Sequence, residues 1–207
     1  MQSKKTDANL ICRSLKSAVC LMLVLLIAGA FMLPACSNTD GAVAKVQEDL
    51  YLLQTTKSAG NQLTGVRNLV SKDSGRNIDA FLDNIRDFDY EITGSVRKVD
   101  GDDHYTVVTV RIRTCDYGSE YLKAWKDYLD SCDSAGTDPA DNMNGFYDGL
   151  FRRLAAVKER NYVTDVGIIA IDPLDNGEWI TNISSNEELQ DALFGGMISE
   201  MKYLAGE

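Results

Sequence analysis

The sequence predicts an α+β domain: helices come first, a curved antiparallel sheet of about four strands follows, and a helix ends the chain. Three observations support this prediction. Apolar residues recur at helical spacing over residues 43–85. Alternation with a period of two replaces this spacing over residues 88–114, and residues 162–172 form a β-branched run. Segregated runs of helices and strands are typical of the α+β class.

The N-terminal third of the domain is expected to be helical. A helix is predicted over residues 42–58, where four apolar side chains share one face: Val43, Val46, Leu50 and Leu53. Gly60 interrupts the pattern, which resumes over residues 63–72 and, in a shorter helix, over residues 78–85. Spacings of three and four residues place such side chains on one side of a helix, so each segment has an apolar face to bury.

A β-hairpin is predicted next. Residues 88–96 alternate between apolar and polar side chains, Asp100-Gly101-Asp102-Asp103 supplies the turn, and residues 105–114 return. Because side chains on a strand alternate between two faces, four residues of the second strand share one face: Thr106, Val108, Val110 and Ile112. Two helices, over residues 119–131 and 146–157, are then expected as an insertion between the second and third strands.

The C-terminal part completes the sheet. Residues 162–172 are apolar on both faces, which predicts a central strand, and Asn176-Gly177 is a hairpin signal before a strand over residues 178–183. Ser185 and Glu188 fit a capping box that opens the last helix. Gly195-Gly196 inside that helix predicts a kink or a split.

A basic leader and an apolar run precede this domain. The leader has one acidic residue, Asp7, against Lys4, Lys5, Arg13 and Lys16. An apolar run of about 16 residues after a basic end is typical of a secretory signal and short for a membrane-spanning helix of ~20 residues. Leu33-Pro34-Ala35-Cys36 resembles the lipobox of bacterial lipoprotein signal peptides. This resemblance implies that the Cys36 thiol receives a diacylglyceryl group and that a peptidase cuts just before it.

The lipobox resemblance implies three parts of the chain: a removed signal peptide over residues 1–35, a lipidated tether over residues 36–41 and a domain over residues 42–207. Acyl chains of the palmitate type at Cys36 then hold the protein on the extracytoplasmic face of the cell membrane. The alternative is an uncleaved signal anchor in which Cys36 has no role.

Charge restricts the partners. The chain has 21 basic and 31 acidic residues, of which the leader holds four and one, so the remainder has 17 and 30 and a net charge of −13. Such a domain repels nucleic-acid phosphates and anionic lipid headgroups, so nucleic acid is not expected as a partner. A cation site among four residues of the acidic loop is the alternative to a solvated loop: Asp130, Asp133, Asp138 and Asp141.

Cys115 and Cys132 are the two cysteines that remain after the leader and Cys36. The predicted helix between them is ~18 Å long, whereas the Cα atoms of a disulfide lie within ~7 Å. A disulfide therefore requires the helix to fold back, and an extracytoplasmic site would permit one; free thiols are the alternative. Two thiols without a histidine partner are a poor metal site, so neither a metal nor another cofactor is expected.

The order of elements and one C-terminal segment suggest a family. Gly177-Glu178-Trp179-Ile180, followed by residues 185–196 (SNEELQDALFGG), resembles the end of uncharacterised lipoproteins of Gram-positive bacteria with a nuclear transport factor 2-like domain. The resemblance covers residues 43–204. It implies a curved sheet wrapped by helices into a cone with a pocket at its mouth, and it leaves activity open because the fold serves enzymes and binding modules alike.

No catalytic set emerges from the sequence. His104 is the only histidine and lies beside the predicted turn, where a solvated side chain is expected rather than a base. Asp165 is the one carboxylate in an otherwise apolar strand row, and the resemblance makes a pocket carboxylate a possible base. Asp165, Tyr105 and Trp179 are therefore the candidate pocket residues, and a structural ion pair between Asp165 and Arg111 or Arg113 is the alternative.

The favoured function is a membrane-tethered extracytoplasmic protein that binds a small apolar molecule, a peptide or an envelope protein in its cone or on its sheet. An extracellular small-molecule isomerase or hydrolase with a pocket carboxylate is the alternative. A structural envelope component without a pocket is a third.

Overall fold

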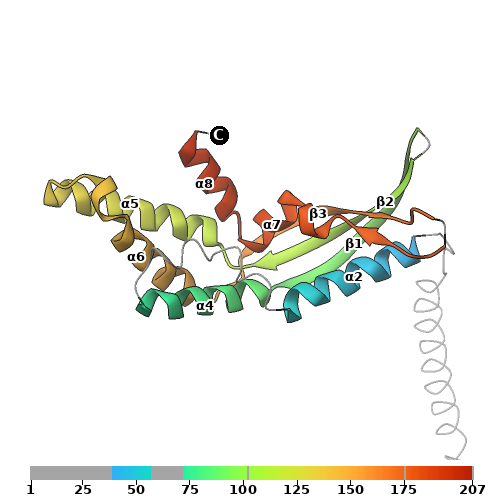
Figure 1. Ribbon diagram of the computed structural model, residues 1–207, viewed down its shortest axis with the longest axis horizontal. Helices are drawn as coiled ribbons and strands as arrows, with labels where there is room; N and C mark the ends of the chain where they lie inside the picture. The colour runs from blue at the N-terminus through green and yellow to red at the C-terminus, as the bar shows by residue number, and fades with distance from the viewer. Residues whose placement is uncertain (1–38, 57–71, 102, 175, 207) are drawn as a thin grey trace, which may run out of the picture. The chain divides into compact units, whose positions relative to one another are not determined.

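Four antiparallel strands form the sheet, in the order β1-β2-β3-β4 (Figure 1). They are β1 (Asp89–Asp100), β2 (Asp103–Thr114), β3 (Tyr162–Ile171) and β4 (Ile180–Thr181). β1 and β2 form the predicted hairpin, whose turn contains Gly101 at a φ of +62°. The sheet is therefore a meander in which each strand pairs with its neighbour in sequence.

Six α-helices accompany the sheet in the part of the chain that the structure describes, which confirms the α+β class. Two short 3₁₀ segments, η2 (Pro139–Asn142) and η3 (Ile183–Ser185), precede α6 and α7. The helices are α2 (Asp40–Thr55), α4 (Lys72–Arg86), α5 (Tyr117–Ala135), α6 (Met143–Ala156), α7 (Glu187–Leu193) and α8 (Met197–Ala205). Helices α5 and α6 are the predicted insertion between β2 and β3.

This computed structural model describes residues 39–56, 72–101, 103–174 and 176–206. The predicted signal peptide and Cys36 therefore lie outside the described residues, as does nearly all of the helix predicted over residues 63–72. The described chain belongs to one compact unit, Asn38–Glu207.

One face of the sheet is buried under α2 and α7. Thr106, Val108, Val110 and Ile112 are buried as predicted, and β3 adds Val166, Ile168 and Ala170. Ala42, Val46 and Leu50 of α2 and Leu189 and Ala192 of α7 pack into the same cluster. The alternating pattern thus specifies which face of the hairpin is covered, because neighbouring residues must point to the opposite side.

Strand β3 is central, as predicted, but only one of its faces is covered. Val163, Ile169 and Ile171 are exposed on the other face. No described helix packs on this second face.

Strand β4 is shorter than the strand predicted over residues 178–183. The side chain of Asp172 accepts hydrogen bonds from the backbone N–H groups of Asn176 and Gly177, at 3.2 and 2.7 Å, and holds the connection as a loop. Beyond Thr181, the Asn182 side chain accepts from the backbone N of Ile169 at 2.9 Å. The Asn182 N–H still donates to the Ile169 carbonyl at 3.0 Å, so its side chain replaces only the return hydrogen bond of the ladder, and η3 begins at Ile183.

A second apolar cluster lies where α4, α5 and α6 meet. Phe81 of α4 forms an edge-to-face pair with Tyr117 of α5, with ring centroids 5.0 Å apart, and also contacts Phe151 of α6 at 6.0 Å. Cys115 is buried in this cluster, Cys132 is buried elsewhere, and both are free thiols, so the disulfide does not form. Because α5 runs from Tyr117 to Ala135 as one helix, it keeps the two cysteines near its opposite ends.

The glycine pair splits the last helix in two, as predicted. Gly195 and Gly196 have φ values of +55° and +78°, a region that favours glycine, and they separate α7 from α8. A Cβ on Gly195 would lie 1.9 Å from the carbonyl oxygen of Cys115, and the Gly195 carbonyl accepts from Gly118 N at 3.0 Å. The turn after α7 is thus fixed to the start of α5.

The predicted capping box is wrong by one residue. Asn186, not Ser185, is the N-cap of α7, because its buried side chain accepts from Leu189 N at 3.0 Å. The same amide donates to the Gly167 carbonyl at 2.8 Å, so this residue also attaches α7 to β3.

Gly195→Ala is expected to lower the free energy of unfolding by about 3 kcal/mol, because it combines backbone strain with a steric clash. Gly149→Ala is the matched control: Gly149 lies inside α6 with open space around an added Cβ, so alanine should stabilise by up to ~1 kcal/mol. Urea unfolding of residues 38–207 measures both. Equal effects would contradict the packing assigned to Gly195.

Tyr117→Phe is expected to reduce the loss of stability at high pH. Burial, and secondly the Cys115 thiol, raises the pKa of the Tyr117 phenol far above its usual range. An unfolded tyrosine ionises near pH ~10, so the stability from this group is present below that pH and is lost as the pH rises above it. Between about pH 9 and pH 11 the variant should lose about 1 kcal/mol less than the parent in urea unfolding. Tyr203→Phe, at an exposed position, should behave like the parent; an unchanged loss in Tyr117→Phe would contradict the prediction.

Candidate ligand-binding pocket

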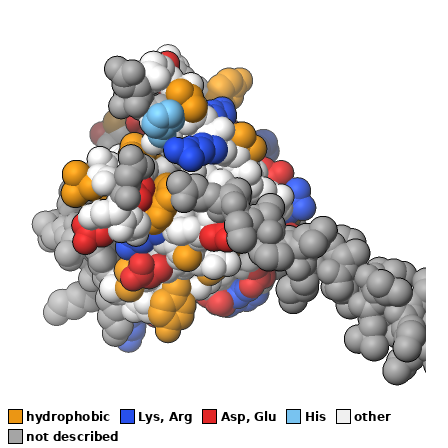
Figure 2. Space-filling view, turned by 90° about the vertical axis from the view of Figure 1, so that its right-hand side faces the viewer, with side chains coloured by type: hydrophobic (Ala, Val, Ile, Leu, Met, Phe, Trp, Pro, Cys, Tyr) orange, Lys and Arg blue, Asp and Glu red, His pale blue; other side chains and the backbone are white. Residues whose placement is uncertain are grey.

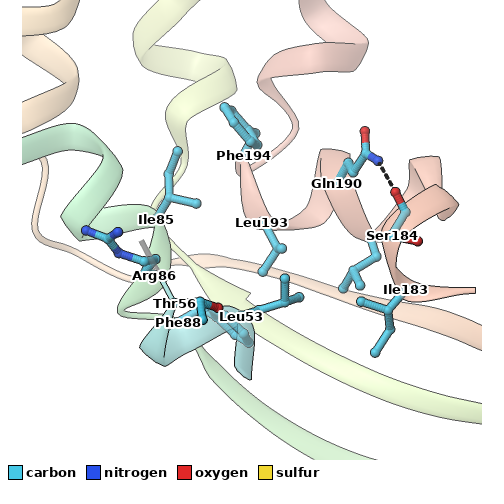
Figure 3. A pocket seen from close by; sticks show the side chains of 11 residues that line it. Leu53, Thr56, Ile85, Arg86, Phe88, Ile183, Ser184, Gln190, Leu193 and Phe194 are labelled. Atoms are coloured by element: carbon cyan, nitrogen blue, oxygen red, sulfur yellow. Dashed lines mark hydrogen bonds between the residues drawn. The ribbon is translucent and has the colours of Figure 1, made fainter. Parts of the chain in front are cut away.

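A cleft opens where α2, α4 and α7 meet the start of β1 (Figure 3). Its volume is about 230 Å³. Seven apolar side chains line it, from α2, α4, η3 and α7 and from the residues just before β1 and just after α7: Leu53, Ile85, Phe88, Ile183, Leu189, Leu193 and Phe194. Four polar residues complete the lining: Thr56, Arg86, Ser184 and Gln190. Apolar walls with a few polar groups are the usual composition of a small-molecule pocket.

The end of α2 forms one wall. Ala42, Val46 and Leu50 anchor this helix on the sheet, and Gln54 Nε2 donates to the Phe88 carbonyl at 2.7 Å. This hydrogen bond joins the last turn of α2 to the start of β1. Leu53 of α2 and Phe88 before β1 therefore have fixed positions on the same side of the cleft.

Helix α7 forms the opposite wall. Asn186 anchors its N-terminus and the turn at Gly195 anchors its C-terminus. These two anchors fix the positions of Leu189, Leu193 and Phe194 along the cleft. Figure 3 shows Leu193 and Ile183 on this side, facing Leu53. The cleft is thus a consequence of how α2 and α7 share one face of the sheet.

The polar groups of the cleft are mostly engaged with the protein. Gln190 Nε2 donates to the Ser184 carbonyl at 3.2 Å. Arg86 forms an ion pair with Asp83 of its own helix, and its guanidinium group points away from Leu193 in Figure 3. Among the described lining residues there is no carboxylate and no imidazole.

The three candidate pocket residues named from the sequence do not line this cleft. Asp165 lies on the exposed face of the sheet, where Arg111 Nε and Nη2 donate to its two carboxylate oxygens at 2.9 and 3.1 Å. This is the structural ion pair weighed as the alternative. Tyr105 lies half-buried on the same strand as Arg111, and Trp179 packs against Gly41 at the start of α2.

Other candidate groups occupy separate places. His104 is exposed at the start of β2. In the acidic loop, Asp130 pairs with Lys126, and Asp138 accepts from Ala140 N at 2.8 Å. The described chain contains no group of three or more His, Cys, Asp or Glu side chains that could hold a metal ion.

A second, polar groove of about 520 Å³ lies beside the start of α5 and the end of α6. Its charged groups neutralise one another or nearby groups: Lys123 pairs with Glu120 at 2.7 Å, and Arg153 pairs with Asp127 at 2.6 Å. Paired surface charges select no class of ligand, so the apolar cleft is the stronger candidate.

Comparison of the chain with protein-family models, curated proteins and solved structures found no match. Within the described residues, no helix has both the length and the apolar character needed to cross a membrane.

Ser184→Trp is expected to weaken the binding of a neutral apolar probe, N-phenyl-1-naphthylamine, at least tenfold in a fluorescence titration. Ser184 is an exposed lining residue, so an indole there occupies the mouth of the cleft without entering the core. Ser185→Trp is the matched control, since Ser185 is the next exposed residue and does not line the cleft. Equal affinities for the two variants, or no saturable binding by the parent, would contradict the assignment.

Proposed function

We propose that this protein is a lipid-anchored extracytoplasmic binding protein. Acyl chains on Cys36 hold it at the cell membrane, and its domain binds a small apolar molecule in the cleft between α2 and α7. The signal peptide, the tether and the domain divide the chain as the sequence predicts.

The observation that carries the proposal is Leu33-Pro34-Ala35-Cys36 at the end of an uncharged run that follows a basic leader. No charged residue lies between Lys16 and Asp40, and α2 begins at Asp40. Four residues span at most ~14 Å, so a lipid on Cys36 holds the start of α2 close to the bilayer. The acidic domain itself is repelled by anionic headgroups, which leaves the acyl chains as the means of attachment.

We further propose that the domain has the nuclear transport factor 2-like cone and that the lipoproteins with this domain are its family. Support comes from the antiparallel meander, from the two helices that cover one of its faces and from the apolar cleft between them. The cleft then corresponds to the pocket at the mouth of the cone.

Binding is favoured over catalysis by the composition of the cleft. An isomerase or hydrolase of the kind considered needs a carboxylate inside the pocket, and the described lining residues include none. The nearest candidate from sequence, Asp165, forms its ion pair with Arg111 on the exposed sheet face. An apolar ligand, in contrast, needs only the walls that are present.

Cys36→Ala is expected to abolish lipidation. Full-length protein, expressed in a bacterium that processes lipoproteins and fed an alkyne fatty acid, should carry the label and begin at Cys36, whereas Cys36→Ala should be unlabelled and unprocessed. Cys20→Ala is the matched control, because Cys20 lies in the predicted signal peptide and should leave labelling intact. Mass spectrometry of the N-terminal peptide measures both properties. Label on Cys36→Ala, or a parent chain that begins upstream of Cys36, would contradict the proposal.

A further inference from the structure

The sheet has one face that no described helix covers. We call it the outer face, and its residues lie in rows set by the strand register. One row is Val96–Val107–Ile169. Toward the turn lie the pairs Lys98–Tyr105 and Ile171–Ile180, and then Asp100–Asp103. On the other side lie Gly94–Thr109–Gly167, Glu91–Arg111–Asp165 and Asp89–Arg113–Val163. Neighbours within a row share a face, so each row is a line of adjacent side chains.

Two adjacent rows, from Val96–Val107–Ile169 to Tyr105 and Ile171–Ile180, form an exposed apolar band beside Lys98. Val96 is 59% exposed, Ile169 36% and Ile180 58%, and all three come from different strands. Figure 2, which views the end of the domain that carries this turn, shows hydrophobic side chains at the surface among charged ones. The strand register places these residues on adjacent rows, and a cluster of exposed apolar side chains of this kind is typical of an interaction surface.

The outer face is only weakly acidic. Its strand residues carry three basic and five acidic side chains, a net charge of −2: Lys98, Arg111, Arg113, Asp89, Glu91, Asp100, Asp103 and Asp165. The rest of the acidic protein repels a second copy, since the chain beyond the leader has a net charge of −13. A second copy therefore meets less repulsion if it approaches through this face than through the rest of the surface.

We propose that the outer face binds the outer face of a second copy of this chain. The two sheets pack face to face, related by a two-fold axis that runs along the strands between β2 and β3. This axis places β2 of each copy opposite β3 of the other and keeps every row opposite itself, which is the aligned packing that twisted sheets adopt.

This arrangement makes the face self-complementary. Arg111 lies opposite Asp165 of the second copy, and Asp165 lies opposite its Arg111, so the paired charges of one copy bridge to the other. In the apolar band, the same two-fold axis places Val107 opposite Ile169 of the second copy. Opposite charges and apolar groups therefore meet reciprocally, as an isologous interface requires.

The row Gly94–Thr109–Gly167 lies between the Arg111–Asp165 row and the Val107–Ile169 row, and its small residues allow the two sheets to approach. Thr109 lies opposite Gly167 of the second copy, and an added Cβ on Gly167 would meet only Val107 Cγ1, at 3.3 Å, within its own chain. The space above Gly167 is thus free to receive the threonine side chain. At a sheet separation of ~10 Å and a strand spacing of ~4.8 Å, the two Thr109 Cα atoms lie roughly 11 Å apart.

The direction of the axis also agrees with the proposed lipid anchor at Cys36. This part of the argument, unlike the rest, depends on that proposed anchor. A two-fold axis along the strands leaves both α2 N-termini at the same end of the dimer. Both tethers then enter one bilayer, where confinement to the membrane raises the effective concentration of one copy around the other.

Cysteine crosslinking of the full-length protein in its own membranes tests the proposal. Thr109→Cys should give a covalent dimer with a short bis-maleimide, at least fivefold above Thr137→Cys, whose site is exposed in the loop after α5. Cys115 and Cys132 are buried, and the parent chain measures the background from the remaining cysteines. A band no stronger than the control, or a crosslinked product of another mass, overturns the second copy as the partner.

Charge reversal separates association from folding. In the Thr109→Cys background, Arg111→Asp alone and Asp165→Arg alone should each reduce the dimer at least fivefold, because like charges then face one another. Co-expression of the two variants under different tags should restore the mixed dimer, since two aspartates of one copy meet two arginines of the other. Unchanged crosslinking in either single variant, or no recovery in the mixture, overturns the arrangement. Fatty-acid labelling of the same samples keeps the proposals apart: labelled protein without crosslinks overturns the dimer, and crosslinked protein without label overturns only the anchor.

Discussion

The burial of one sheet face under α2 and α7 is the constraint on which the rest of the structure depends. Val108, Val110 and Ile112 of β2 and Val166 and Ile168 of β3 are at most 1% exposed. Each such side chain contributes roughly 1.5–3 kcal/mol when it is fully buried. Because a shift by one residue would exchange the two faces, this burial also determines the register of the strands and the composition of the outer face.

The cleft and the outer face are two consequences of that packing. Helices α2 and α7 lie on the same face, and the space between the last turn of α2 and the side of α7 is the apolar cleft. Asn186 and Gly195 determine where α7 begins and ends, so they decide the shape of the cleft without lining it. The remaining side chains of the same strands point away from the helices and leave a second surface for a partner.

Local sequence patterns predicted the elements correctly where the pattern itself determines the local backbone. Alternation identified the buried face of β2, and the glycine pair at 195–196 identified the split between α7 and α8. The same patterns failed where a long-range contact decides the outcome. The uncovered face of β3 depends on which helices reach it, and the short β4 depends on Asn182 and Asp172 replacing ladder hydrogen bonds.

The candidate pocket shows the same limit. Leu53 was recognised as an apolar residue on a helix face, but periodicity does not distinguish a side chain that fills a core from one that lines a cleft. Asp165 stood out as a lone carboxylate in an apolar row, and the register explains it through Arg111, its neighbour on β2. Cys36 lies outside the described residues, so the anchor remains a prediction from the sequence.

Methyl NMR of residues 38–207 is the most direct test of whether the space between α2 and α7 is a ligand site. Titration with N-phenyl-1-naphthylamine should shift the methyl signals of Leu53, Ile85 and Leu193 and leave those of Val96 and Ile169 on the outer face unchanged. Shifts confined to the outer face, or no shifts at saturating probe, would contradict it.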